Sequence, residues 1–111
     1  MVQKDKGLIV TTATDVPGKQ VKEVLGIVRG NTVRARNIGR DIGAGFKNLI
    51  GGEVKTYTDM VTQARDEAYN RMVNKAIESG ADAVIGVRFM TSMVVQGAAE
   101  MLAYGTAVKL K

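Results

Sequence analysis

The last third of the chain alternates apolar and polar residues with a period of two, and this pattern constrains the fold more than any other. The alternation runs over residues 81–95 and again over 99–110, and only Gln96, Gly97 and Ala98 separate the two runs. Successive side chains of a strand point to opposite faces, so each run predicts a strand, and the short separation predicts a long β-hairpin. The predicted faces hold Ala83, Ile85, Val87 and Phe89 in the first run, and Leu102, Tyr104, Thr106, Val108 and Leu110 in the second.

Two shorter strands are predicted near the start of the chain. Residues 8–12 are a β-branched run, and residues 24–33 are apolar at Leu25, Ile27 and Val28. Between them, Pro17-Gly18 suits the central positions of a type II turn. Gly26 and Gly30 interrupt the second strand, which indicates bulges or a close approach of another backbone.

The middle of the chain changes to a helical period. Residues 58–79 predict a helix with Thr58 as its N-cap and Gly80 as the residue that ends it. Residues 37–49 predict a second helix, which three interior glycines weaken by about 1 kcal/mol each. Gly39 and Gly43 share one face, so either that face contacts another backbone or the segment is only partly helical. The apolar stripe of the longer helix comprises Val61, Ala64, Ala68, Met72, Ala76 and Ile77.

These elements follow one another in the order β-β-α-α-β-β, which predicts an α+β fold. An antiparallel sheet with helices packed on one face is the expected architecture. A chain of 111 residues has room for one domain, so residues 1–111 are interpreted as a single domain with a loose segment at 1–7.

The composition excludes several kinds of chemistry. The chain has no Cys and no His, so no disulfide, thiolate or imidazole is available. A Met cluster on the predicted hairpin could hold Cu(I), but Met90 and Met93 differ by three positions along a strand and point to opposite faces. The six Met residues are therefore interpreted as core packing. No candidate nucleophile is spaced from a candidate general base as in a known catalytic motif. We therefore expect no catalytic residue, no metal ligand and no cofactor.

The net charge of +5 is concentrated between residues 29 and 47, where five basic residues stand against Asp41 alone. Such a cluster attracts anions. Arg34, Arg36 and Lys47 are therefore candidate ligands for an anionic small molecule. Arg40 is instead predicted to pair with Asp41 or with a neighbouring subunit. Nucleic acid is a weaker candidate partner, because no aromatic residues interleave with these arginines.

Two further expectations concern structure and location. Arg65 and Asp82 are predicted to pair and to tie the long helix to the following strand. The first residues, which include Lys4, Asp5 and Lys6, lack the apolar run of a signal peptide, and no apolar stretch approaches the roughly 20 residues that span a bilayer. A cytoplasmic protein without a membrane partner is therefore expected.

Several short motifs, taken together and in order, resemble the YbjQ-like family over residues 8–109. They are Gly26-Ile27-Val28-Arg29-Gly30, Asn37-Ile38-Gly39-Arg40-Asp41-Ile42, Gly51-Gly52 with Tyr57, Ala64-Arg65 with Ala68, the run 80–87 (GADAVIGV), and Gly105-Thr106-Ala107-Val108.

The resemblance implies a dodecin-like subunit and a ring-shaped homopentamer in which short extra strands link neighbours. The family carries a heavy-metal-binding label, has no defined role and supplies no catalytic residues. Many members look acidic where this chain has Arg88 and Met90, which removes two oxygen ligands. We therefore predict a non-catalytic homo-oligomeric binding or scaffold module. The alternatives are anion or nucleic-acid binding by residues 29–47, and metal binding, which the lack of Cys and His disfavours.

Overall fold

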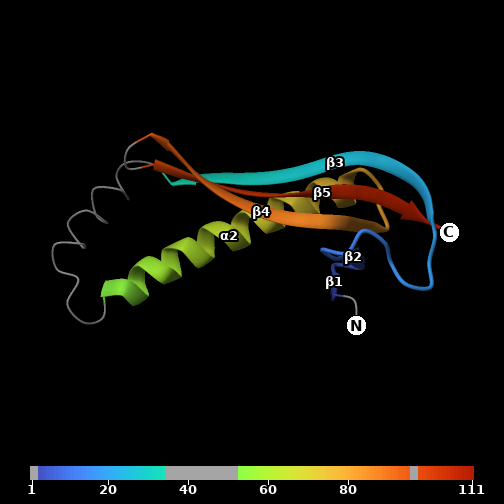
Figure 1. Ribbon diagram of the computed structural model, residues 1–111, viewed down its shortest axis with the longest axis horizontal. Coiled ribbons are helices and arrows are strands. Elements are labelled where there is room, and N and C mark those ends of the chain that lie inside the picture. The colour runs from blue at the N-terminus through green and yellow to red at the C-terminus, as the bar shows by residue number, and fades with distance from the viewer. Residues whose placement is uncertain (1–2, 35–52, 96–97) are drawn as a thin grey trace.

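The computed structural model describes residues 3–34, 53–95 and 98–111 (Figure 1). The described part of the chain forms one helix and a five-stranded sheet, which is an α+β architecture. The elements are β1 (Gln3–Asp5), β2 (Leu8–Val10), β3 (Val21–Arg34), α2 (Glu53–Glu78), β4 (Ala83–Val95) and β5 (Ala98–Leu110). The helix predicted over residues 37–49 lies outside the described residues.

The sheet has the strand order β1-β2-β4-β5-β3 and is mixed. The predicted hairpin is confirmed: β4 pairs with β5 in antiparallel register, and β5 pairs with β3 in the same sense. The expectation of a purely antiparallel sheet is wrong, because β2 runs parallel to the start of β4. A parallel pair needs a long crossover between its strands, and β3 with α2 supplies it here.

The start of the chain is more ordered than the sequence suggested. Residues 1–7 were expected to be loose, yet Gln3–Asp5 form β1 and pair with β2. Lys6 and Gly7 both have positive φ, 54° and 82°, as a two-residue hairpin turn requires. The turn at Pro17-Gly18 is confirmed as type II, with φ of 77° at Gly18 and a hydrogen bond from Lys19 N to Val16 O.

The helix α2 begins five residues earlier than predicted, so Thr58 lies inside it and is not its N-cap. Its end is as predicted: Gly80 has φ of 81°, and the Ala81 N–H donates to Ala76 O in a Schellman motif. The buried stripe also differs at two positions. Val73 is fully buried, whereas Ile77 is 41% exposed.

The helix packs closely on β3 and β5, and small residues allow this approach. A Cβ atom on Gly30 would collide with Ala68 O and Met72 N of α2, which confirms the predicted close approach at Gly30. The buried Thr32 hydroxyl, also on β3, donates to Ala64 O. The core beneath the helix is completed by fully buried Ala103 and Ala107 of β5.

A β-bulge near Gly86 reverses the faces of β4. Gly86 has φ of 62°, and the pairing with β5 shifts between Ile85 and Arg88. After the shift, Val84, Val87 and Phe89 lie on the helix side, and Ile85 lies on the other side. The prediction that Ile85 and Phe89 share a face is therefore wrong. A bulge places two residues opposite one, and strict alternation cannot anticipate it.

Candidate binding groove

The helix leaves the outer part of β4 uncovered, and a groove lies there. Although α2 crosses β3 and β5, it scarcely contacts β4. Phe89 and Met93 are on the helix side of β4, but they remain 47% and 72% exposed. The interpretation of all Met residues as core is therefore wrong for Met93, and also for Met90, which is 52% exposed.

The far wall of the groove is the segment that follows β2. Its backbone is tied to the start of β4 by bonds from Thr11 N to Val84 O and from Val87 N to Thr11 O. The Arg88 guanidinium donates to Thr12 O at 3.0 Å. These bonds hold Thr11 and Thr12 beside β4, so the wall is firmly positioned before any ligand arrives.

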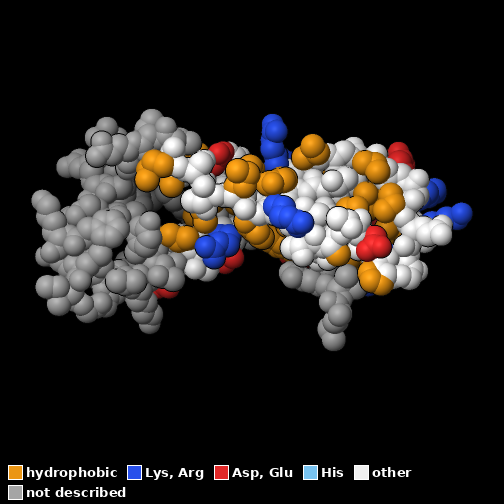
Figure 2. Space-filling model, in the orientation of Figure 1, with side chains coloured by type: hydrophobic (Ala, Val, Ile, Leu, Met, Phe, Trp, Pro, Cys, Tyr) orange, Lys and Arg blue, Asp and Glu red, His pale blue; other side chains and the backbone are white. Residues whose placement is uncertain are grey.

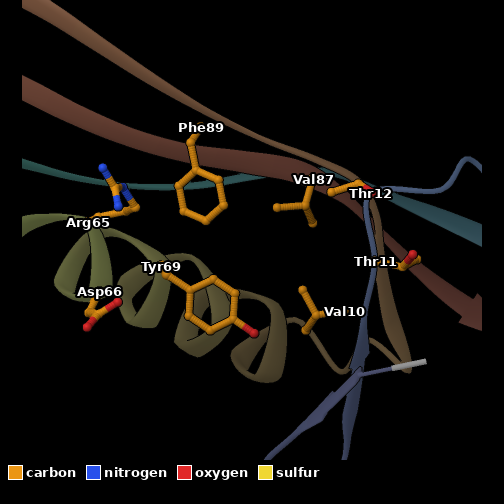
Figure 3. A pocket seen from close by; sticks show the side chains of 8 residues that line it. All are labelled: Val10, Thr11, Thr12, Arg65, Asp66, Tyr69, Val87 and Phe89. Atoms are coloured by element: carbon orange, nitrogen blue, oxygen red, sulfur yellow. The ribbon is translucent and has the colours of Figure 1, made fainter. Parts of the chain in front are cut away.

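The groove encloses about 300 Å³, which is at the lower end of the range for small-ligand sites. Figure 3 shows the rings of Tyr69 and Phe89 lying against each other between α2 and β4. Their centroids are 6.3 Å apart and their planes differ by 20°, a stacked arrangement. The lining residues are Val10, Thr11, Thr12, Arg65, Asp66, Tyr69, Val87 and Phe89.

One end of the groove carries both signs of charge. Arg65 and Asp66 are consecutive on α2 and both line the groove: Arg65 lies on the Phe89 side, whereas Asp66 lies on the Tyr69 side (Figure 3). Within residues 3–34, 53–95 and 98–111, no ion pair or hydrogen bond engages the Arg65 side chain. Its guanidinium is therefore available to a ligand.

A second hollow of about 370 Å³ lies on the other side of the sheet, next to Ile9 and Val16. Three lysines from distant parts of the chain, Lys4, Lys19 and Lys111, stand around it together with Asp82. The Asp82 Oδ2 atom accepts a hydrogen bond from Leu110 N at 2.8 Å. The predicted pairing of Asp82 with Arg65 is therefore wrong, because Arg65 belongs to the groove and Asp82 fastens the end of β5.

The sheet face opposite α2, here called the open face, exposes several large apolar side chains, with Arg29 opposite Tyr104 among them. The strand register places Val24, Ile27 and Met90 on it, and these are 64%, 77% and 52% exposed. The 11–20 loop covers only one end of this face, where Val16 packs on Ala83 and Val108. Figure 2 shows hydrophobic side chains at the surface over the strands, with Lys and Arg scattered among them.

The residues predicted to bind an anion are only partly within the described structure. Arg34 is the last residue of β3, where it pairs with Ala99. Arg36 and Lys47, and the predicted structural residues Gly39, Arg40, Asp41 and Gly43, lie outside the described residues. Anion binding by this segment therefore stays a prediction.

The sequence did not point to the groove, because its aromatic pair joins two distant segments. Tyr69 lies on the helix and Phe89 on β4, and the bulge at Gly86 turns Phe89 toward the helix. The sequence does hold one indication: the chain has only five aromatic residues, and an aromatic residue is a common contact point for ligands.

Among the described residues, no group of three or more Asp or Glu side chains could hold a metal ion. None of the described helices is long and apolar enough to cross a membrane.

The fold is that of a small α+β domain, and comparison with known proteins gives its family. The model of the YbjQ family, described as "putative heavy-metal-binding", matches residues 8–111. The chain therefore belongs to this family, as the motifs indicated.

Curated relatives support the same assignment. A UPF0145 protein of Methanoculleus marisnigri is 63% identical over 93% of this chain and 96% of its own length. Those of Archaeoglobus fulgidus and Thermotoga maritima are 56% and 57% identical, over 96% and 94% of this chain and 99% and 98% of their own lengths.

A solved structure has the same fold. It is a protein of unknown function from Pediococcus pentosaceus, which its title assigns to the DUF74 family. It is 21% identical to this chain, with a TM-score of 0.63 over 96% of this chain and all of that one.

Proposed function

We propose that this chain is a non-catalytic binding and scaffold module that assembles with copies of itself. The observation that carries this proposal is the open face. Ile27 projects three quarters of its surface from the centre of a β-strand, and Val24 and Met90 project from the same face. Exposed apolar side chains are common singly, but several large ones on one sheet face favour an interaction surface, here a mixed one because Arg29 lies on the same face opposite Tyr104.

The edge of the sheet supports the same proposal. β3 is 14 residues long and stands at the end of the strand order, with β5 as its neighbour in the described structure. A long edge strand offers unpaired backbone groups to other chains. Burying the open face and this edge against further copies would remove apolar surface from water at about 25 cal/mol per Å².

The groove supports the binding part of the proposal. It lies on the helix side of the sheet, whereas the open face lies on the other side. Copies that associate through the open face would therefore leave each groove accessible. A module of this kind presents several equal binding sites on one particle, and an assembly of five is the number that the family resemblance implies.

A second candidate function is anion binding by residues 29–47, which the excess of five basic residues over one acid favours. If these residues form a ligand site, Arg36→Glu abolishes low-salt binding to heparin and leaves the native mass unchanged. If Arg40 instead joins subunits, Arg40→Ala lowers the native mass or the melting temperature. Undetectable heparin binding by the unaltered protein would contradict this candidate.

Light scattering coupled to size-exclusion chromatography tests the assembly. The expected native mass is a whole multiple of the 11.9 kDa chain, with five as the expected number. A mass of 11.9 kDa across the micromolar range, where specific interfaces of standard size are already formed, would contradict the proposal.

A further inference from the structure

We propose that the groove between α2 and β4 binds a small, flat aromatic acid. The ring of the ligand packs on the exposed face of Phe89, and its carboxylate pairs with Arg65. This inference names the ligand class for the binding role proposed above, and it does not depend on how many copies assemble.

The aromatic part of the proposal follows from where the chain places its scarce rings. Only five of its 111 residues are aromatic, and two of them stack in this groove. Phe89 lies on the helix side of the sheet, but α2 scarcely contacts β4, and 47% of the Phe89 surface is exposed. Stacked rings give a flat apolar platform, and a planar ring packs on such a platform with a stacking gain beyond its buried area.

The acidic part follows from the charges around the platform. Arg65 lies on the Phe89 side of the groove, whereas Asp66 lies on the Tyr69 side (Figure 3). A planar guanidinium forms two parallel hydrogen bonds to a carboxylate. The net charge of +5 also favours anions over cations at the surface as a whole.

The size and walls of the groove limit the ligand to a small molecule. A volume of about 300 Å³ admits one or two fused rings with a short acid group, and Val10 and Val87 close the apolar end. Thr12 lines the end of the groove opposite Arg65 (Figure 3).

Calorimetry with 2-naphthoate as the probe tests the proposal. Two matched probes serve as controls: cyclohexanecarboxylate lacks the aromatic ring, and 2-naphthylmethylamine lacks the acid. We expect naphthoate to bind at millimolar concentration or below, and both matched probes to bind at least about tenfold more weakly, because each loses one of the two interactions.

Three variants assign the contacts. Arg65→Gln should weaken naphthoate binding about tenfold or more, because a charge-assisted hydrogen bond is lost. Phe89→Leu, which keeps an apolar side chain, should also weaken it. Asp66→Asn should strengthen naphthoate binding about twofold, because it removes a negative charge that repels the carboxylate of the ligand. Circular dichroism of each variant confirms that the fold is retained.

The opposite pattern would overturn the proposal. If 2-naphthylmethylamine binds more tightly than naphthoate and Asp66→Asn weakens binding, the ligand is a cation. If none of the three probes binds, the groove is not a site for small aromatic acids. The native mass, measured on the same samples, distinguishes the two proposals. A monomer that binds naphthoate would contradict only the proposal of self-assembly. An oligomer that does not bind naphthoate would contradict only the proposal of an aromatic acid ligand.

Discussion

The two faces of the sheet are built from the same strands but from different kinds of side chain. On the helix side, Gly30, Ala103 and Ala107 are small and buried, and the backbone of α2 lies directly against Gly30. On the open face, Ile27 and Met90 are large, apolar and exposed. Small residues are typical of close packing within a chain, whereas large exposed ones contribute most when another molecule covers them. Among the described residues, α2 covers the helix side over β3 and β5, whereas the open face is covered only at one end, by the 11–20 loop.

The largest expected effect is on the helix side. Met72 is fully buried, so Met72→Ala leaves a cavity and should lower the free energy of unfolding by about 3 kcal/mol. Urea denaturation measures this loss, which should be equal at all protein concentrations. The matched control is Met90→Ala on the open face, for which any loss of stability should vary with protein concentration. If both variants lost the same free energy of unfolding at every protein concentration, the proposed difference between the two faces would be contradicted.

The next effect concerns the close approach at Gly30. A Cβ atom there meets the backbone of α2 at Ala68 and Met72, and backbone cannot move aside as the end of a flexible side chain can. Gly30→Ala should therefore cost about 2 kcal/mol of unfolding free energy. Arg29→Ala changes the neighbouring, exposed residue of β3 and should cost less than about 0.5 kcal/mol. A neutral Gly30→Ala would mean that the helix is not held tightly against β3.

A smaller effect is expected at Thr32, the one polar side chain buried among the described residues. Its hydroxyl donates to Ala64 O at 3.1 Å, so Thr32→Val should cost about 1 kcal/mol in thermal or urea unfolding. Thr32→Ser keeps the hydroxyl and serves to separate the hydrogen bond from the packing. If Thr32→Val were as stable as the unaltered protein, this bond would not help to hold the helix on the sheet.

The smallest expected effect is that of metal ions. Without Cys or His, the chain offers no soft ligand other than Met to Zn²⁺, Cd²⁺ or Hg²⁺. Their addition at neutral pH should leave the melting temperature unchanged, because a ligand stabilises a fold only when it binds the folded state. Stoichiometric, submicromolar binding of any of them in calorimetry would contradict this prediction and would direct attention to carboxylates on adjoining subunits.

The sequence predicted those features that depend on neighbours in the chain. The hairpin of β4 and β5, the turn at Pro17-Gly18 and the end of α2 at Gly80 were all predicted, because each follows from local alternation or from a glycine with positive φ. The parallel pairing of β2 with β4 was missed, because it joins segments more than 70 residues apart. A run as short as β2 carries no signal of its partner.

The groove was missed for a related physical reason. Its formation depends on the bulge at Gly86, which moves Phe89 to the helix side, and on the path of α2, which leaves β4 uncovered. A hydrophobic period of two or of 3.6 residues predicts strands and helices, but it predicts neither a bulge nor the path of a helix over a sheet. The predicted role of Arg65 as a partner of Asp82 failed in the same way, since the helix carries Arg65 to the groove and not to the end of β5.

The most direct test of the central claim, that the open face joins copies of this chain, is the sedimentation mass of two matched variants. Ile27→Lys places a charge on the open face, where Ile27 is 77% exposed, and Ile77→Lys places one on α2, where Ile77 is 41% exposed. Both positions accept a charge in the isolated chain, but a buried unpaired charge is costly in an interface. We predict that Ile27→Lys sediments as a folded 11.9 kDa monomer, whereas Ile77→Lys keeps the oligomer mass of the unaltered protein. An Ile27→Lys variant that keeps the full oligomer mass would contradict the claim.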